Sequence, residues 1–226
     1  MIIRKNNISA GYFEKDNILK LEDYKDIINQ AIFFDLEHYV YKKPICVGVF
    51  GCSYYDEYSN EIKVTQYMIE DSFDAEKILF LAEKYFIDMN TKYNKKYIIT
   101  FSGNNDFTVI NYLFEKFGIE YKICDNFYHI DLQKIYERDK KCGIGLKALE
   151  KEFEISRESE LISGSTLAKT FGKIVKDKDY FNRMPQHKKE KILLYNEQDV
   201  VSLFHILVNW NNIIIDKIDE QNSEEI

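Results

Sequence analysis

The 226-residue sequence is poor in the residues that break or cross-link a chain. It contains 2 prolines, 9 glycines and 4 cysteines, against 45% hydrophobic residues. This composition excludes collagen-like and disordered proteins and leaves enough apolar material for a packed core. The cysteines form no Cys-x-x-Cys pair, so we expect four reduced thiols and neither a zinc site nor a disulfide framework.

Long apolar runs are also missing. Typical runs, such as residues 78–82, are far shorter than the roughly 20 residues that a membrane-spanning helix needs. The first residues, Met-Ile-Ile-Arg-Lys-Asn-Asn, lack the apolar centre of a signal peptide. We therefore expect a cytoplasmic protein with no membrane partner.

An excess of positive charge, which is common in nucleic-acid-binding proteins, is absent, because the formal net charge is −7. The charge is unevenly distributed, however. Residues 134–191 contain 15 basic and 10 acidic residues, a net of +5, which leaves −12 for the rest of the chain. Because one basic face is enough to attract a polyanion, the acidic total does not exclude a nucleic-acid substrate.

The apolar patterning predicts an α/β fold with a mixed five-stranded sheet flanked by helices. The expected strands are 31–37, 45–50, 62–69, 97–101 and 127–131. Turn-prone residues separate the first three strands and predict an antiparallel meander. Helical periodicity at 73–89 and 106–117, between the later strands, predicts parallel β-α-β crossovers. Residues 132–210 are expected to be mostly helical, with an irregular stretch at 177–186.

Three segments follow from this pattern. We expect the main domain to cover residues 31–210. A polar lead-in with a short helix near 22–30 would precede it in residues 1–30, and an acidic tail would follow in residues 211–226.

The expected first strand, Ala31-Ile-Phe-Phe-Asp-Leu-Glu37, carries two acids. Because side chains alternate along a strand, Asp35 and Glu37 leave the same face as Phe33. A carboxylate in a buried strand is costly unless a cation or hydrogen-bond donors compensate it. Two such acids form half of a site for a hard cation such as Mg²⁺ or Mn²⁺, unless they simply reach solvent at the end of the strand.

Two further acids occur at informative places. Asp106 follows the strand at 97–101, at the carboxyl edge of the sheet, although an Asp at the start of a helix is ordinarily a cap. Asp199 lies on the apolar stripe of a helix and must therefore face something that neutralises it. Tyr195 lies one turn before Asp199 on the same stripe, either as part of the same site or as an ordinary core tyrosine.

Together these residues resemble the DEDD, or DnaQ-like, 3′→5′ exonucleases, which have a ribonuclease H-like fold. Phe34-Asp-Leu-Glu37 is similar to their first motif, Ser102-Gly-Asn-Asn-Asp106 to the second, and Tyr195-x-x-x-Asp199 to the third in its tyrosine (DEDDy) form. Four further segments resemble one branch of these proteins, the YprB-like domains: Gly145-Leu-Lys-Ala-Leu-Glu150, Arg157, Ser163-Gly164 and Tyr195-Asn-x-x-Asp-Val200. The sequence departs from the family at His38, Ser102 and Asn105, which puts substrate preference in doubt more than catalysis.

The resemblance implies a two-metal mechanism. Asp35 would bridge two Mg²⁺ or Mn²⁺ ions, Glu37 and Asp199 would complete the ion that activates water, and Asp106 would hold the other. Tyr195 would orient the attacking water. Asp131 is a helix cap or an outer member of the site, with the cap favoured.

The expected substrate is DNA or RNA with a single-stranded 3′ end. Lysines of residues 134–191 and Arg157 are candidates to follow its phosphates, and aromatic residues could stack on its bases. Two alternatives remain: a ribonuclease H-like endonuclease, and a non-catalytic nucleic-acid-binding or scaffold domain. A requirement for a chain end separates the first from an exonuclease, and metal-dependent cleavage would exclude the second.

Overall fold

A mixed six-stranded sheet forms the centre of the molecule. The computed structural model describes residues 1–21, 24, 26–157 and 162–215, and orders the strands β1-β4-β3-β2-β5-β6. The strands are β1 (Ile2–Ser9), β2 (Ala31–Tyr41), β3 (Lys43–Asp56), β4 (Glu61–Met68), β5 (Tyr97–Thr100) and β6 (Tyr128–Asp131). The pairs among β1 to β4 are antiparallel, whereas β2–β5 and β5–β6 are parallel. The predicted α/β class, with a meander followed by parallel units, is confirmed.

The sheet has one strand more than the sequence predicted. Strand β1 lies within residues 1–30, which were predicted as a polar lead-in, and pairs with β4 along its whole length. Its side chains alternate between half-buried and exposed, with Arg4 and Asn6 on the half-buried side. Its polar sequence gave no apolar face to recognise. Backbone pairing holds it at the sheet edge, where charged side chains are common because they discourage further strand pairing.

Strand β2 is also longer than expected. The strand predicted at 31–37 ends too early, because β2 continues to Tyr41 and the reversal before β3 is confined to Lys42, whose φ is +59°. The register with β3 shifts between Glu37 and His38. Such bulges re-aim the side chains around them and are frequent next to functional sites.

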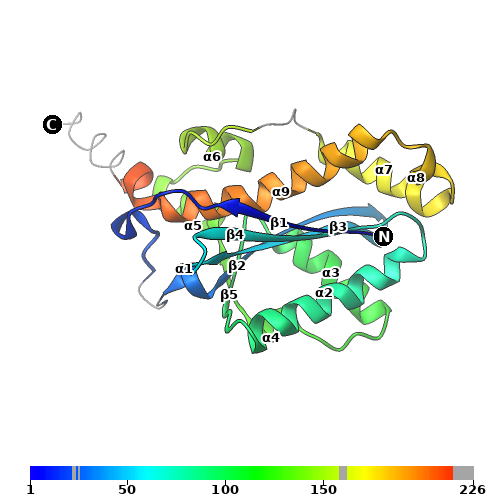
Figure 1. The fold of residues 1–226 in the computed structure, drawn as a ribbon, viewed down its shortest axis with the longest axis horizontal. Coiled ribbons are helices and arrows are strands. Elements are labelled where there is room, and N and C mark those ends of the chain that lie inside the picture. The colour runs from blue at the N-terminus through cyan, green and yellow to red at the C-terminus, as the bar shows by residue number, and fades with distance from the viewer. Residues whose placement is uncertain (22–23, 25, 158–161, 216–226) are drawn as a thin grey trace.

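Helices cover both faces of the sheet (Figure 1). On one face lie α2 (Asp74–Thr91), α3 (Asn104–Lys116) and α4 (Ile123–Asn126), and on the other α6 (Leu146–Glu152), α7 (Gly164–Lys176) and α9 (Gln186–Val208). The remaining elements are η1 (Lys15–Asn17), α1 (Ile27–Gln30), α5 (Leu132–Lys140), α8 (Tyr180–Arg183) and η2 (Asn211–Ile215). Helix α8 occupies part of the stretch predicted to be irregular, and the predicted tail beyond Ile215 lies outside the described residues.

The two faces of the sheet have different cores. On the α2 and α3 side, Phe34 packs against Phe50, Phe86 and Phe107, with ring centroids 5.5–5.8 Å apart. On the α9 side, Phe33 packs edge-on against Phe204 at 5.8 Å. Such aromatic pairs add to the stabilisation from buried area and fix how each helix lies on the strand.

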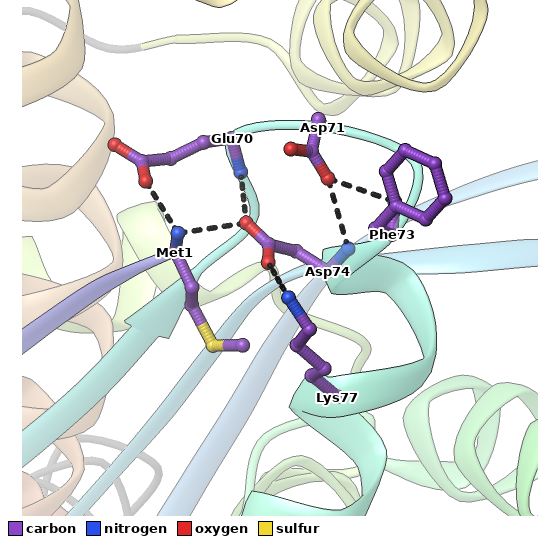
Figure 2. Close-up of polar contacts among 6 residues, drawn as sticks. All are labelled: Met1, Glu70, Asp71, Phe73, Asp74 and Lys77. Carbon is purple, nitrogen blue, oxygen red and sulfur yellow. Dashed lines mark hydrogen bonds and ion pairs between the residues drawn. The ribbon is translucent and has the colours of Figure 1, made fainter.

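The start of α2 is tied to the beginning of β1 (Figure 2). Asp71, three residues before the helix, accepts hydrogen bonds from the amides of Phe73 and Asp74, at 2.8 and 3.1 Å. The Asp74 carboxylate accepts from the amide of Glu70 at 3.0 Å and lies 2.8 Å from the amino group of Met1, which also contacts Glu70. These contacts link the edge strand to the helical layer.

No helix among the residues described here is both long and apolar enough to span a membrane.

Candidate active site

The centre of β2 carries two acids toward α9. Asp35 pairs with Gly51 of β3 and Glu37 pairs with Val49, so both lie in the middle of the sheet. Their face is the one that buries Phe33 against α9. The predicted common face of Asp35 and Glu37 is therefore present, and it points into the layer between the sheet and α9.

Asn196 of α9 fixes Asp35 in place. Its Nδ2 donates to Asp35 Oδ2 at 2.9 Å, while its Oδ1 accepts from Gln66 Nε2 at 2.8 Å. Gly51 makes this close approach feasible, because a Cβ there would lie 2.1 Å from Asn196 Oδ1. Asn196 belongs to the motif Tyr195-Asn-x-x-Asp-Val200, but the sequence alone assigned it no role. Its position directly after Tyr195, on the same helix as Asp199, was the sequence feature that could have indicated a role in the site.

Asp199 is neutralised by two cations from outside α9. Its Oδ1 is contacted by Lys147 Nζ, from α6, and by Arg157 Nη2, from the segment that follows α6. Arg157 is bidentate with the buried Glu150, with Nε 2.7 Å from Oε2. The expectation that Asp199 faces a neutralising group is confirmed. The side chain of Arg157 is 9% exposed and is bound to two carboxylates, which disfavours the suggestion that it follows substrate phosphates.

Three carboxylates converge at this place. Ligand oxygens of Asp35, Glu37 and Asp199 all lie within 4.8 Å of one another. Burial, followed by repulsion from Asp199, raises the pKa of Asp35 to about 7. Burial and then Asp35 and Asp199 raise the pKa of Glu37 well above its ordinary value. Since the charged forms are costly here, a divalent cation would relieve the site, and hard oxygen donors suit Mg²⁺ or Mn²⁺.

Asp106 borders this group but is not one of the three. It lies in the first turn of α3, whose N-cap position is Gly103, so the cap interpretation of Asp106 is wrong. Its pKa is raised well above the ordinary value by burial and then by Asp35, Asp131 and Asp199. Because Asp35 and Asp199 contribute to this shift, the Asp106 carboxylate lies close enough to interact electrostatically with both of them.

The three departures from the family pattern lie around Asp106. His38 Nδ1 is 3.7 Å from Asp106 Oδ1, and His38 Nε2 is 3.3 Å from Asn105 Nδ2. His38 and Asn105, two of the residues that depart from the family pattern, therefore contact each other. Ser102, the third, has a φ of +57° and donates its amide to Asp131 Oδ1 at 2.9 Å. Asp131 also accepts from the amide of Gln133 and caps α5, as favoured from the sequence.

Tyr195 lies beside the acids, under the two cations. The Lys147 Nζ is 4.5 Å and the Arg157 Cζ 5.3 Å from the centroid of its ring. Burial, followed by repulsion from Asp199 and Glu37, raises its pKa above the ordinary value of 10. The hydroxyl therefore stays protonated at neutral pH and can donate a hydrogen bond but cannot serve as a base.

The sheet and its carboxylate cluster define an α/β protein with a candidate divalent-metal site. A family model described as the RNase_H superfamily matches residues 32–211. The chain therefore belongs to the RNase H superfamily, and membership indicates a nuclease-type enzyme that acts on nucleic acid with divalent metal ions. No curated protein and no solved structure matches the chain.

Proposed function

We propose that this protein is a cytoplasmic 3′→5′ exonuclease that hydrolyses DNA or RNA from a single-stranded 3′ end. The observation that carries the proposal is the convergence of Asp35, Glu37 and Asp199 within 4.8 Å. Tyr195 stands one helical turn from Asp199, as in the tyrosine form of the DEDD motif that the sequence resembles. The likeness to that subtype adds the direction of cleavage to the nuclease-type activity of the superfamily.

In this proposal, the four carboxylates would hold two Mg²⁺ or Mn²⁺ ions. Asp35 would be shared between the ions, Glu37 and Asp199 would complete one of them, and Asp106 would belong to the other. Bound in this way, the ions would activate a water molecule and stabilise the leaving oxygen. The raised pKa values of Asp35, Glu37 and Asp106 support this assignment, because such carboxylates gain most from a nearby cation.

The chain's own groups have separate roles. Tyr195 donates its hydroxyl to orient the attacking water. Asn196 holds Asp35 by its 2.9 Å hydrogen bond. Lys147 and Arg157 pair with Asp199 in the absence of metal, and Lys147, which is 28% exposed, can turn to a substrate phosphate when an ion takes its place.

The two alternatives make different predictions. An endonuclease would not need a chain end, and the placement of Tyr195 beside Asp199 favours the exonuclease. A scaffold domain would be expected to lose some of the acids. Asp35, Glu37, Asp106 and Asp199 are all present here, and three of them converge.

The test is incubation with end-labelled single-stranded DNA and RNA and with closed circles of the same sequence, each in Mg²⁺, in Mn²⁺ and in chelator. We expect stepwise release of mononucleotides from the 3′ end of the linear strands, in metal only. Efficient cutting of the circles would replace the exonuclease proposal with the endonuclease one. An absence of any metal-dependent cleavage would favour the scaffold domain.

A further inference from the structure

A cavity of about 510 Å³ lies between the beginnings of α7 and α9. Lys188, Lys191 and His187 of α9 line one side of it, and hydroxyl residues at the start of α7, Ser163 and Thr166, line the other. Leu167, Ile192 and neighbouring aliphatic residues form its apolar part. We call this cavity the α7–α9 groove. It combines cations, hydrogen-bond donors and an apolar surface.

The charge of the groove distinguishes it from three other cavities among the described residues. Each of those has at least two Asp or Glu residues in its lining. Among the residues that the structure describes, the lining of the α7–α9 groove contains none. Within the part of the chain that the structure describes, no carboxylate lies within ion-pair distance of Lys188. A cavity of this charge fits an anion, and its apolar part fits a ligand that is not purely ionic.

Helix α9 connects the groove with the acidic site. Residues 188, 191, 195 and 199 follow one another by three or four positions, so Lys188, Lys191, Tyr195 and Asp199 share one stripe of the helix. At about 1.5 Å per residue, the two lysines lie about 12 and 16 Å before Asp199 along the axis. Helix α7 lies over the continuation of β2 past the acids, since Gly172 packs against Tyr39.

This distance fits a chain of nucleotides. A stacked strand rises by about 3.4 Å per nucleotide, so the lysines would meet the phosphates about four or five stacked nucleotides from the acids, or fewer in an extended strand. The apolar part and His187 would contact sugars and bases without reading their sequence.

We infer that the α7–α9 groove binds the 5′-continuing strand of the substrate, with Lys188 and Lys191 on its backbone phosphates. The inference rests on the proposed function, because it places the 3′ end at the acids. Binding in the groove should make oligonucleotides that extend into it better substrates than a dinucleotide, which reaches only the acids.

The test compares Lys188→Gln/Lys191→Gln with wild type and with Lys116→Gln/Lys122→Gln. The control removes the same charge from two exposed lysines at the end of α3 and the start of α4, on the other face of the sheet. Binding of 5′-labelled DNA and RNA single strands of 2 to 12 nucleotides is measured by fluorescence anisotropy in Ca²⁺ over a series of salt concentrations. Cleavage of a dinucleotide and of a 12-mer is measured in Mn²⁺. Melting temperatures confirm that all proteins are folded.

For the groove variant we expect a Kd for the longer strands that is about 10-fold higher at low salt. The slope of the logarithm of the binding constant against the logarithm of the salt concentration should be smaller in magnitude by about 1.4, which is about 0.7 for each lost phosphate contact. Its cleavage of the dinucleotide should equal that of wild type, and the control should match wild type throughout. A comparison of the DNA and RNA strands shows which of them the groove prefers.

Equal binding of long strands by the groove variant and the control would overturn the inference and leave the exonuclease proposal intact. Length-dependent binding that needs the two lysines, without any cleavage, would support the groove and refute the exonuclease. If wild type neither binds nor cleaves any strand, both proposals are wrong.

Discussion

The two faces of β2 differ although they belong to the same few residues. On one face, Ile32, Phe34 and Leu36 are at most 4% exposed and pack into the core against α2 and α3. On the other, Phe33 is equally buried, but Asp35 and Glu37 follow it. Both faces are covered by helices, so the acids gain little from solvent. One face contributes stability, and the other gives up stability to hold charges close together.

The helices that cover these faces differ in the same way. Against Phe34, α3 places Phe107 with its ring centroid 5.8 Å away. Against Asp35, α9 places the Asn196 amide, and α6 and the segment after it supply Lys147 and Arg157 for Asp199. On the α9 side, Asp35 and Asp199 therefore each have a polar partner. This difference can be tested by removing one side chain from each face.

The largest effect should come from Asp35→Asn. Loss of a shared metal ligand should lower kcat by at least about 10³-fold. The same change removes a repelling charge, so it should raise the melting temperature of the metal-free protein and abolish most of the stabilisation by Mn²⁺. For wild type, a hundredfold excess of metal over Kd adds about 2.7 kcal/mol, a rise of very roughly 5–10 °C for a domain of this size.

Phe34→Ala is the matched change on the opposite face. It should cost about 3–5 kcal/mol of stability, because it leaves a cavity among Phe50, Phe86 and Phe107. Its response to Mn²⁺ should stay that of wild type. Thermal melts with and without Mn²⁺ measure both variants. If wild type and Asp35→Asn show the same Mn²⁺ dependence, the acids form no metal site and the nuclease mechanism fails.

A smaller effect is expected from Tyr195→Phe, which removes one hydroxyl and keeps the ring under Lys147 and Arg157. A single positioned donor contributes about 2–4 kcal/mol to a transition state, so turnover should fall by roughly 10–10³-fold. Substrate Kd should change little, because the ring contacts remain. Single-turnover rates and anisotropy separate the two quantities.

Asp199→Asn serves as the comparison for Tyr195→Phe, since it weakens the metal site and should reduce turnover more. Full activity of Tyr195→Phe on several substrates would remove the assigned role of the hydroxyl. A loss of binding as large as the loss of turnover would make Tyr195 a packing residue.

Elements with a regular apolar pattern were easier to predict from the sequence than elements without one. The apolar pattern of residues 31–37 located the start of β2 but not its end at Tyr41, and the helical period of 73–89 predicted α2 closely. Strand β1 was missed because backbone pairing with β4 places it, and pairing leaves no pattern in a polar sequence.

Among the candidate site residues, the spacing along one strand predicted the common face of Asp35 and Glu37. The partners of Asp199 could not be derived in this way. Lys147 and Arg157 lie 52 and 42 residues away in the sequence, and only the packing of α6 and the following segment beside α9 brings them to it. The pair formed by His38 and Asn105 depends likewise on how β2 meets α3.

The smallest expected effect is a pH dependence of stability. The pKa of Asp35 rises from 3.8 to about 7 on folding. The folded protein therefore binds this proton more tightly than the unfolded chain, and the resulting stability is lost as the pH rises from about 4 to about 7. Between pH 5.5 and 7.5 the loss from this one group is about 2 kcal/mol, or about 5 °C in melting temperature.

The lowered pKa values of the half-buried His38 and His205 act in the opposite direction, because these histidines favour folding more as they lose their protons. The measurement is therefore the difference in melting temperature between wild type and Asp35→Asn, in chelator, across this pH range. The difference should grow in favour of the variant as the pH rises, since the histidines are common to both proteins. Saturating Mn²⁺ should reverse its sign at pH 7.5, because the metal stabilises only the protein that keeps the carboxylate. A difference that stays constant with pH would mean that Asp35 is already ionised at pH 5.5, and that the α9 face of β2 bears its charge without the cost argued here.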